Sequence, residues 1–138
     1  MSKTLIIVSA IFIIVFAVGA CIFTCFFSVN ETKDVVTAAS KIHGAGSVIG
    51  FILFLLVPLI FAILSFKAND GITGIISVIS FILAFLFFVL FIMADKPEFS
   101  KSIVAKEGLW QQMNLFFMYL PLGYISIKKF LDWLSSYS

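Results

Sequence analysis

Four uninterrupted apolar stretches occupy most of this 138-residue chain, and none of them contains Asp, Glu, Lys or Arg. They run over residues 5–29, 44–66, 71–94 and 109–127. At about 1.5 Å of rise per residue, each stretch as a helix reaches or nearly reaches the roughly 30 Å hydrocarbon core of a bilayer. Because backbone polar groups in lipid must be paired within the segment, we expect each stretch to be a transmembrane helix.

The composition leaves no room for a separate aqueous domain. Hydrophobic residues make up 62% of the chain and charged residues 12%, against about 25% charged residues in a typical soluble domain. We therefore predict an all-α fold, an integral membrane four-helix bundle that forms a single transmembrane domain over residues 1–138, with short interfacial helices in the loops. The net charge of +2 comes with no basic patch, so a nucleic-acid partner is not expected. All the basic residues are lysines, which suggests a bacterial source and disfavours a nucleotide site.

The connections differ in length and character. Residues 67–70 are the whole link between the second and third spans, so these spans should be adjacent and antiparallel. Apolar positions at helical spacing predict one short surface helix over residues 35–42 and another within residues 95–108. An interfacial tail follows the fourth span and contains Phe130, Leu131, Trp133, Leu134 and Tyr137, and Trp110 marks the opposite edge of that span.

Four spans place both ends of the chain on one side of the membrane. That side carries Lys3, Lys67 and the pair Lys128 and Lys129, whereas the other five lysines lie in the longer connections, interleaved with acidic residues. The lysine pair at the end of a span favours a cytoplasmic location for both termini of a multi-pass protein in the inner (plasma) membrane.

Stripes of small residues predict where the helices meet, because close packing rather than a hydrophobic drive holds helices together in lipid. The stripes are Ala10, Ala17, Cys21, Thr24 and Ser28 in the first span, Gly46 and Gly50 in the second, and Thr73, Ser77, Ser80 and Ala84 in the third. Pro58 and Pro121 lie inside the second and fourth spans and should bend them.

One polar cluster is predicted from topology rather than from a motif. The second and fourth spans run in the same direction, so their first residues should lie at the same membrane face. The candidate ligand-binding residues there are His43, Ser47, Glu107, Gln111 and Asn114. His43 is the only one of them that ordinarily titrates near neutral pH.

Three interpretations of this cluster stay open. It is a structural network that fixes helix positions, a site for a ligand or lipid headgroup, or a catalytic or metal site. We assign no catalytic residue, metal ligand or cofactor, because one His without Cys or carboxylate at ligand spacing does not build a zinc site. Ser47, four residues after His43, has neither a G-x-S-x-G turn nor a third group that would orient a base.

Two short motifs open the second and fourth spans, Lys-Ile-His-Gly-Ala-Gly over residues 41–46 and Glu-Gly-Leu-Trp-Gln-Gln over residues 107–112. Together they resemble a prokaryotic multi-pass membrane family known as domain of unknown function 998, over about the last hundred residues. The resemblance implies about six spans, of which this chain lacks the first two, and a partner that completes the bundle. Gln112 stands where that family often has Arg, and the family brings no established activity.

Three functions are compatible with the sequence. The leading hypothesis is a non-enzymatic membrane component that packs helices and binds membrane lipids, a second copy of itself or another membrane protein. A small-molecule transporter acting as a dimer is the second, weakened by the absence of a carboxylate within a span for proton coupling. A membrane enzyme or redox protein centred on His43 is the third.

Overall fold

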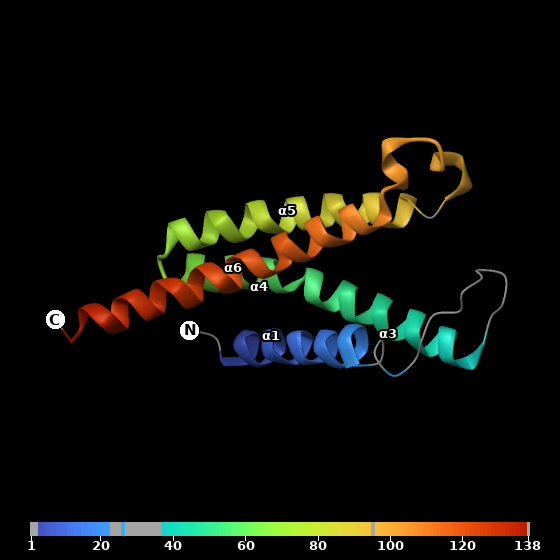
Figure 1. Cartoon of the computed structure of the whole chain (residues 1–138). Coiled ribbons are helices and arrows are strands. Elements are labelled where there is room, and N and C mark those ends of the chain that lie inside the picture. Colours follow the sequence, from blue (N-terminus) through green and yellow to red (C-terminus); the bar gives the residue numbers. More distant parts are fainter. Residues whose placement is uncertain (1–2, 23–25, 27–36, 95, 138) are drawn as a thin grey trace. The chain divides into compact units, whose positions relative to one another are not determined.

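The computed structural model describes residues 3–22, 26, 37–94 and 96–137, without the side chains of Ala20, Cys21, Ser40, His43 and Pro97. Every regular element in this part of the chain is helical, which confirms the predicted all-α class (Figure 1). The elements are α1 (Lys3–Phe16), the π-helical turn η1 (Ala17–Ile22), α3 (Ala38–Leu55), α4 (Val57–Lys67), α5 (Gly71–Ala94), the 3-10 turns η2 (Pro97–Phe99) and η3 (Ile103–Ala105), and α6 (Glu107–Ser135).

Two segments are long and apolar enough to cross a membrane, Gly44–Lys67 and Gly71–Ala94. They correspond to the second and third predicted spans. The first predicted span contains a shorter apolar helix, Lys3–Gly19, and its last residues lie largely outside the described part of the chain. The span count of four, the bundle and the single domain therefore stay predictions. Tertiary contacts divide the chain into two compact units, residues 2–57 and residues 58–138, and each unit is described by itself.

The first unit pairs α1 and η1 with α3 (Figure 1). Its apolar centre is aromatic, because the ring of Phe16 stacks on Phe54 at a centroid distance of 4.6 Å and meets Phe51 edge-on at 5.3 Å. All three rings are buried. Aromatic pairs in these geometries stabilise a contact by about 0.5–1.5 kcal/mol beyond the area they bury. Large rings, rather than small residues alone, thus hold these two helices together.

The predicted small-residue stripe of the first span is wrong where the structure describes it. Ala10 and Ala17 are exposed, whereas Ser9, Phe16 and Gly19 are the buried positions. The contact face is set by the Phe16 ring, which needs space opposite it and rotates the alanines away from α3. The remaining members of the stripe, the side chain of Cys21 with Thr24 and Ser28, lie outside the described residues.

The surface helix predicted before the second span is not separate in the structure. Residues 35 and 36 lie outside the described chain, and α3 begins at Ala38 and runs without a break into the span. The regular helix is interrupted at Leu56, close to Pro58, and the Leu56 N–H donates to the Leu53 carbonyl at 3.2 Å, whereas the bend predicted at Pro58 stays a prediction. Pro58 has no N–H, and its ring clashes with the carbonyl four residues earlier, so the regular α-helical pattern stops at this point.

In the second unit, α4 and α5 are joined by a tight turn over residues 68–70. Asn69 adopts φ 58°, a left-handed conformation that Asn tolerates better than most residues. The Asp70 N–H donates to the Ser65 carbonyl at 2.9 Å, which pairs one of the free carbonyls at the end of α4. The ring of Phe66 in α4 lies against Gly74 in α5, so the two helices are adjacent as predicted.

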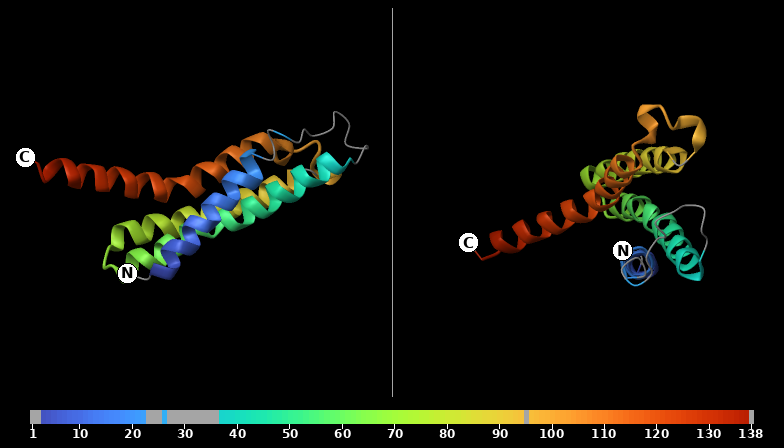
Figure 2. Two further views of the ribbon diagram at one scale, coloured as in Figure 1. Left: turned by 90° about the horizontal axis from the view of Figure 1, so that it is seen from below. Right: turned by 45° about the vertical axis from the view of Figure 1, so that its right-hand side comes forward.

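The stripe of small residues predicted for the third span is confirmed. Its four members, together with Gly74, are the buried residues of α5, and α5 lies side by side with α6 (Figures 1 and 2). The buried residues of α6 are Asn114, Met118 and Pro121, which follow one another at helical spacing. We call these two facing rows the α5–α6 seam. Around Pro121, α6 is not interrupted, although the helix is bent along its length (Figure 2).

The connection between α5 and α6 does not contain the predicted surface helix. It forms two separate 3-10 turns, η2 and η3. Between them, the Ser102 hydroxyl donates to the Phe99 carbonyl at 2.8 Å and accepts the Val104 N–H at 3.2 Å. Such local bonds from a serine side chain offer the backbone an alternative to helix, which explains why Phe99 and Ile103 do not share one helical face.

Candidate functional site

The residues of the predicted polar cluster fall in both units. His43 and Ser47 belong to α3 in the first unit, and Glu107, Gln111 and Asn114 belong to α6 in the second. Ser47 and Gln111 are half-buried, Glu107 is exposed, and the side chain of His43 lies outside the described residues. A site that combines the two sets stays a prediction.

Asn114 has the most constrained surroundings of the four predicted site residues whose side chains the structure describes. Its side chain is 1% exposed and lies within the α5–α6 seam. The amide nitrogen Nδ2 donates to the carbonyl oxygen of Ala84 at 2.7 Å, a bond between residues 30 positions apart that ties α6 to α5. The amide oxygen Oδ1 has no hydrogen-bond partner among the described residues.

Stability alone does not account for Asn114. An intramolecular hydrogen bond contributes about 0.5–1.5 kcal/mol net. A buried acceptor without a partner costs about 1–3 kcal/mol, so the two effects together leave no net gain. Oδ1 can only accept a hydrogen bond, so any group that completes the site must be a donor such as a hydroxyl, an N–H or a water molecule.

A second polar contact lies at the start of α5 and was not predicted. Asp70 caps this helix, because its carboxylate accepts the Thr73 N–H at 3.2 Å and the Thr73 hydroxyl at 2.7 Å. The Lys128 ammonium of α6 donates to the same carboxylate at 2.6 Å. The bond from Lys128 and those from Thr73 lower the pKa of Asp70 to about 2, and the Asp70 carboxylate raises the pKa of Lys128. The contact fixes the end of α6 against the α4–α5 turn.

Half of this contact could have been found in the sequence. An Asp directly before an apolar run is a common helix N-cap, so Asp70 could have been predicted to cap the third span. The partner Lys128 is 58 positions away and carries no local signal.

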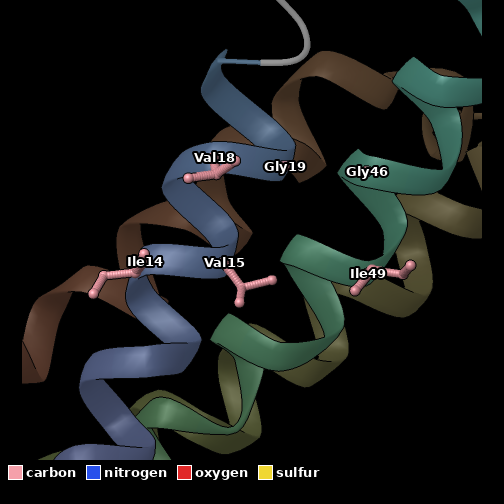
Figure 3. Close-up of a pocket in the computed structure, with 6 residues that line it drawn as sticks. All are labelled: Ile14, Val15, Val18, Gly19, Gly46 and Ile49. Atoms are coloured by element: carbon pink, nitrogen blue, oxygen red, sulfur yellow. The ribbon is translucent and has the colours of Figure 1, made fainter.

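An apolar groove lies between α1, η1 and α3 in the first unit (Figure 3). It has a volume of about 320 Å³ and is lined by Ile14, Val15, Val18, Gly19, Gly46 and Ile49. Figure 3 shows Val15 pointing from α1 toward α3. None of these side chains offers a nucleophile, a charge or a metal ligand, so the groove can accept only apolar groups such as hydrocarbon chains.

The main chains of the two helices touch beside this groove. A Cβ placed on Gly19 would lie only 2.6 Å from the carbonyl oxygen of Gly46. Gly19 belongs to the π-helical turn η1, where the backbone is wider than in an α-helix. Gly46 is one of the small residues predicted to make a helix contact, and the structure bears this out.

The described residues contain no group of three or more His, Cys, Asp or Glu side chains that could hold a metal ion. Comparison with protein-family models, with curated proteins and with solved structures finds no match for the chain. The resemblance to domain of unknown function 998 therefore stays a prediction.

Proposed function

We propose that this chain is a four-span bacterial membrane protein that acts as a non-enzymatic component, packing helices and binding membrane lipids or partner helices. Its place would be the plasma membrane, with both termini in the cytoplasm. The proposal rests chiefly on how α5 distributes its residues between the inside and the surface of the second unit.

The pattern of burial in α5 is the reverse of that in a soluble protein. Its buried residues are small or polar, whereas its exposed residues include Ile72, Ile75, Ile79, Ile82 and Phe85. Only 17% of its most apolar window is buried. The core helix of a soluble protein buries its large apolar residues, because their transfer from water drives folding. Lipid removes this demand, and small residues then allow the backbones to approach closely.

The polar groups of the second unit support packing rather than chemistry. Asn114 binds a backbone carbonyl of α5, Asp70 caps α5 and pairs with Lys128, and Ser77 donates to the Thr73 carbonyl at 2.8 Å. Each of these bonds positions a helix. The Thr73 hydroxyl does lie beside the Asp70 carboxylate, but Thr73 is only 2% exposed, so this pair caps α5 rather than presenting a nucleophile to a substrate.

A labelling experiment tests the predicted crossings of α5 and α6. Single cysteines replace Asn69, Lys101 or Ser136 in a chain without native cysteines, and intact cells are treated with a membrane-impermeant maleimide. We expect label at Lys101→Cys alone, with Asn69→Cys and Ser136→Cys reacting only after lysis. Label on Ser136→Cys and Lys101→Cys together would show that α6 does not cross, and label on Asn69→Cys and Ser136→Cys but not Lys101→Cys would reverse the orientation.

Native mass spectrometry of protein released gently from its own membrane tests the binding role. We expect a defined oligomer, a stoichiometric partner or retained phospholipid. A bare monomer that keeps its structure without lipid would contradict the proposal.

A further inference from the structure

The last turns of α6 extend beyond the start of α5 (Figures 1 and 2). Lys128 pairs with Asp70, the residue directly before α5, and α6 continues beyond Lys128 to Ser135. We call residues 129–137 the C-terminal extension. All of its residues are exposed, including Trp133 at 54% and Tyr137 at 77%.

The C-terminal extension has one apolar and one polar face. Phe130, Trp133 and Leu134 follow the spacing i, i+3, i+4, which places them on the same side of α6, and Tyr137 follows two residues after the helix ends. The three aromatic rings contact one another in turn: Trp133 stacks on Phe130 at a centroid distance of 6.1 Å and meets Tyr137 at 4.9 Å. The other side carries the polar residues Lys129, Asp132, Ser135 and Ser136, and the exposed Leu131 lies at the border of the two faces, between Leu134 and Ser135.

We propose that this aromatic face docks on the headgroup–hydrocarbon boundary of the bilayer, on the side of the α4–α5 turn. The inference rests on the proposed membrane location of α5 and α6. Trp and Tyr favour this boundary because each has an apolar ring and a polar N–H or O–H. The span before it has the right length, since residues 110–127 rise about 27 Å as a helix, close to the hydrocarbon thickness.

The charges of the C-terminal extension itself have little part in this docking. Lys128 is paired with Asp70, and the charges of Lys129 and Asp132 cancel within the extension. Attraction to anionic lipid requires several unpaired basic residues, each contributing about 1 kcal/mol near the surface. The bilayer contact is therefore driven by insertion of the rings, and we expect it to be the same in neutral and anionic vesicles.

Quenching of tryptophan fluorescence by brominated phosphatidylcholine tests the proposal in reconstituted full-length protein. Trp110→Phe leaves Trp133 as the only indole. We expect Trp133 to lose the larger part of its emission when bromine is near the headgroup end of the chains and little when it is near the chain terminus. Added phosphatidylglycerol should not change this result. Far-UV circular dichroism checks that each variant keeps its helix content.

Two matched substitutions in this single-tryptophan protein separate docking from general damage. Leu134→Glu adds a charge to the apolar face, whereas Ser135→Glu adds the same charge one residue later on the polar face. We expect quenching of Trp133 to be lost in the first variant and kept in the second. Equal quenching in the two variants would overturn the assignment of the docking face.

A control distinguishes failure of this inference from failure of the proposed function. Phe85, in the middle of α5, is exposed, and Phe85→Trp in a chain without other tryptophans reports on whether α5 lies in the bilayer. If that reporter is quenched by deep bromine but Trp133 is unquenched and open to acrylamide, the docking is wrong. If Trp133 is unquenched by lipid yet shielded at high protein density, a second copy covers it, and the docking is again wrong. An unquenched Phe85→Trp would refute the membrane location itself.

Discussion

Replacing Gly19 by Ala tests the closest backbone contact of the first unit. The added Cβ would lie 2.6 Å from the Gly46 carbonyl oxygen and 3.3 Å from its carbonyl carbon. The shorter distance falls about 0.8 Å below ordinary van der Waals contact, and both neighbours are main-chain atoms, so η1 and α3 must move apart. Overpacking of this kind costs about 1–3 kcal/mol, against a gain of up to about 1 kcal/mol in helix propensity for Ala over Gly.

Two other glycines separate these contributions. At Gly44 an added Cβ meets nothing within 4 Å, so Gly44→Ala reports helix propensity alone. At Gly74 the Cβ would again lie 2.6 Å from its nearest neighbour, but that neighbour is the ring of Phe66, which is 48% exposed and free to turn toward the surface. We expect Gly44→Ala to leave the free energy of unfolding unchanged or to raise it. Gly74→Ala should lower the free energy of unfolding less than Gly19→Ala does. Relative to Gly44→Ala, Gly19→Ala should lower the free energy of unfolding by about 1–3 kcal/mol.

Titration with sodium dodecyl sulfate measures these differences. The purified variants are unfolded from mild-detergent micelles, and the transition is followed by far-UV circular dichroism. If Gly19→Ala unfolds at the same dodecyl sulfate fraction as Gly44→Ala, the backbones do not touch at Gly46. If all three variants lose stability equally, the effect belongs to glycine in a helix and not to packing.

The contacts of the second unit give further predictions for the same titration. Asn114→Ala removes the bond to Ala84 but also the unpaired oxygen, so we expect the free energy of unfolding to change by less than about 1 kcal/mol. Met118→Ala on the same buried face should lower it by about 2–5 kcal/mol. Equal losses in the two variants would show that the Asn114 amide stabilises the fold. The pair of Asp70 and Lys128 should stabilise the fold throughout the range between their ordinary pKa values of 3.8 and 10.5. Because the pKa of Asp70 is lowered, this stabilisation is lost as the pH falls toward about 2, and because the pKa of Lys128 is raised, it is lost only as the pH rises above 10.5. Asp70→Asn keeps a capping side chain and should flatten the acid side of the pH profile, and an unchanged acid slope would refute the ion pair.

The sequence predicted the packing face of α5 but not that of α1, and the two cases differ in a physical way. In α5 the small residues from Thr73 to Ala84 recur at helical spacing, so one row allows the backbones of α5 and α6 to approach closely. In α1 the ring of Phe16 outweighs the row of alanines, because it fills a space between Phe51 and Phe54 that only the folded chain creates. Residue spacing predicts which residues share a helix face. It does not predict which face packs against a neighbouring helix of complementary shape.

The predicted polar site met a similar limit. Spacing placed Asn114 on the same face as Met118, and the structure buries both. The acceptor of the amide N–H is the backbone carbonyl of Ala84, and a carbonyl carries no mark in the sequence that distinguishes it from its neighbours. Which helix an amide reaches therefore depends on tertiary register.

The alignment of α6 along α5 also explains why α6 carries polar groups that contribute little to the free energy of unfolding. A row of small residues packs almost as well after a shift of one helical turn, so the α5–α6 seam alone leaves the position of α6 weakly specified. Two bonds remove this freedom at different heights. Asn114 reaches the Ala84 carbonyl of α5, and Lys128, nearer the end of α6, reaches the Asp70 carboxylate at the start of α5. Both bonds fail if the helix slides by one turn of about 5.4 Å, so together they select one alignment even where their net free energies are small.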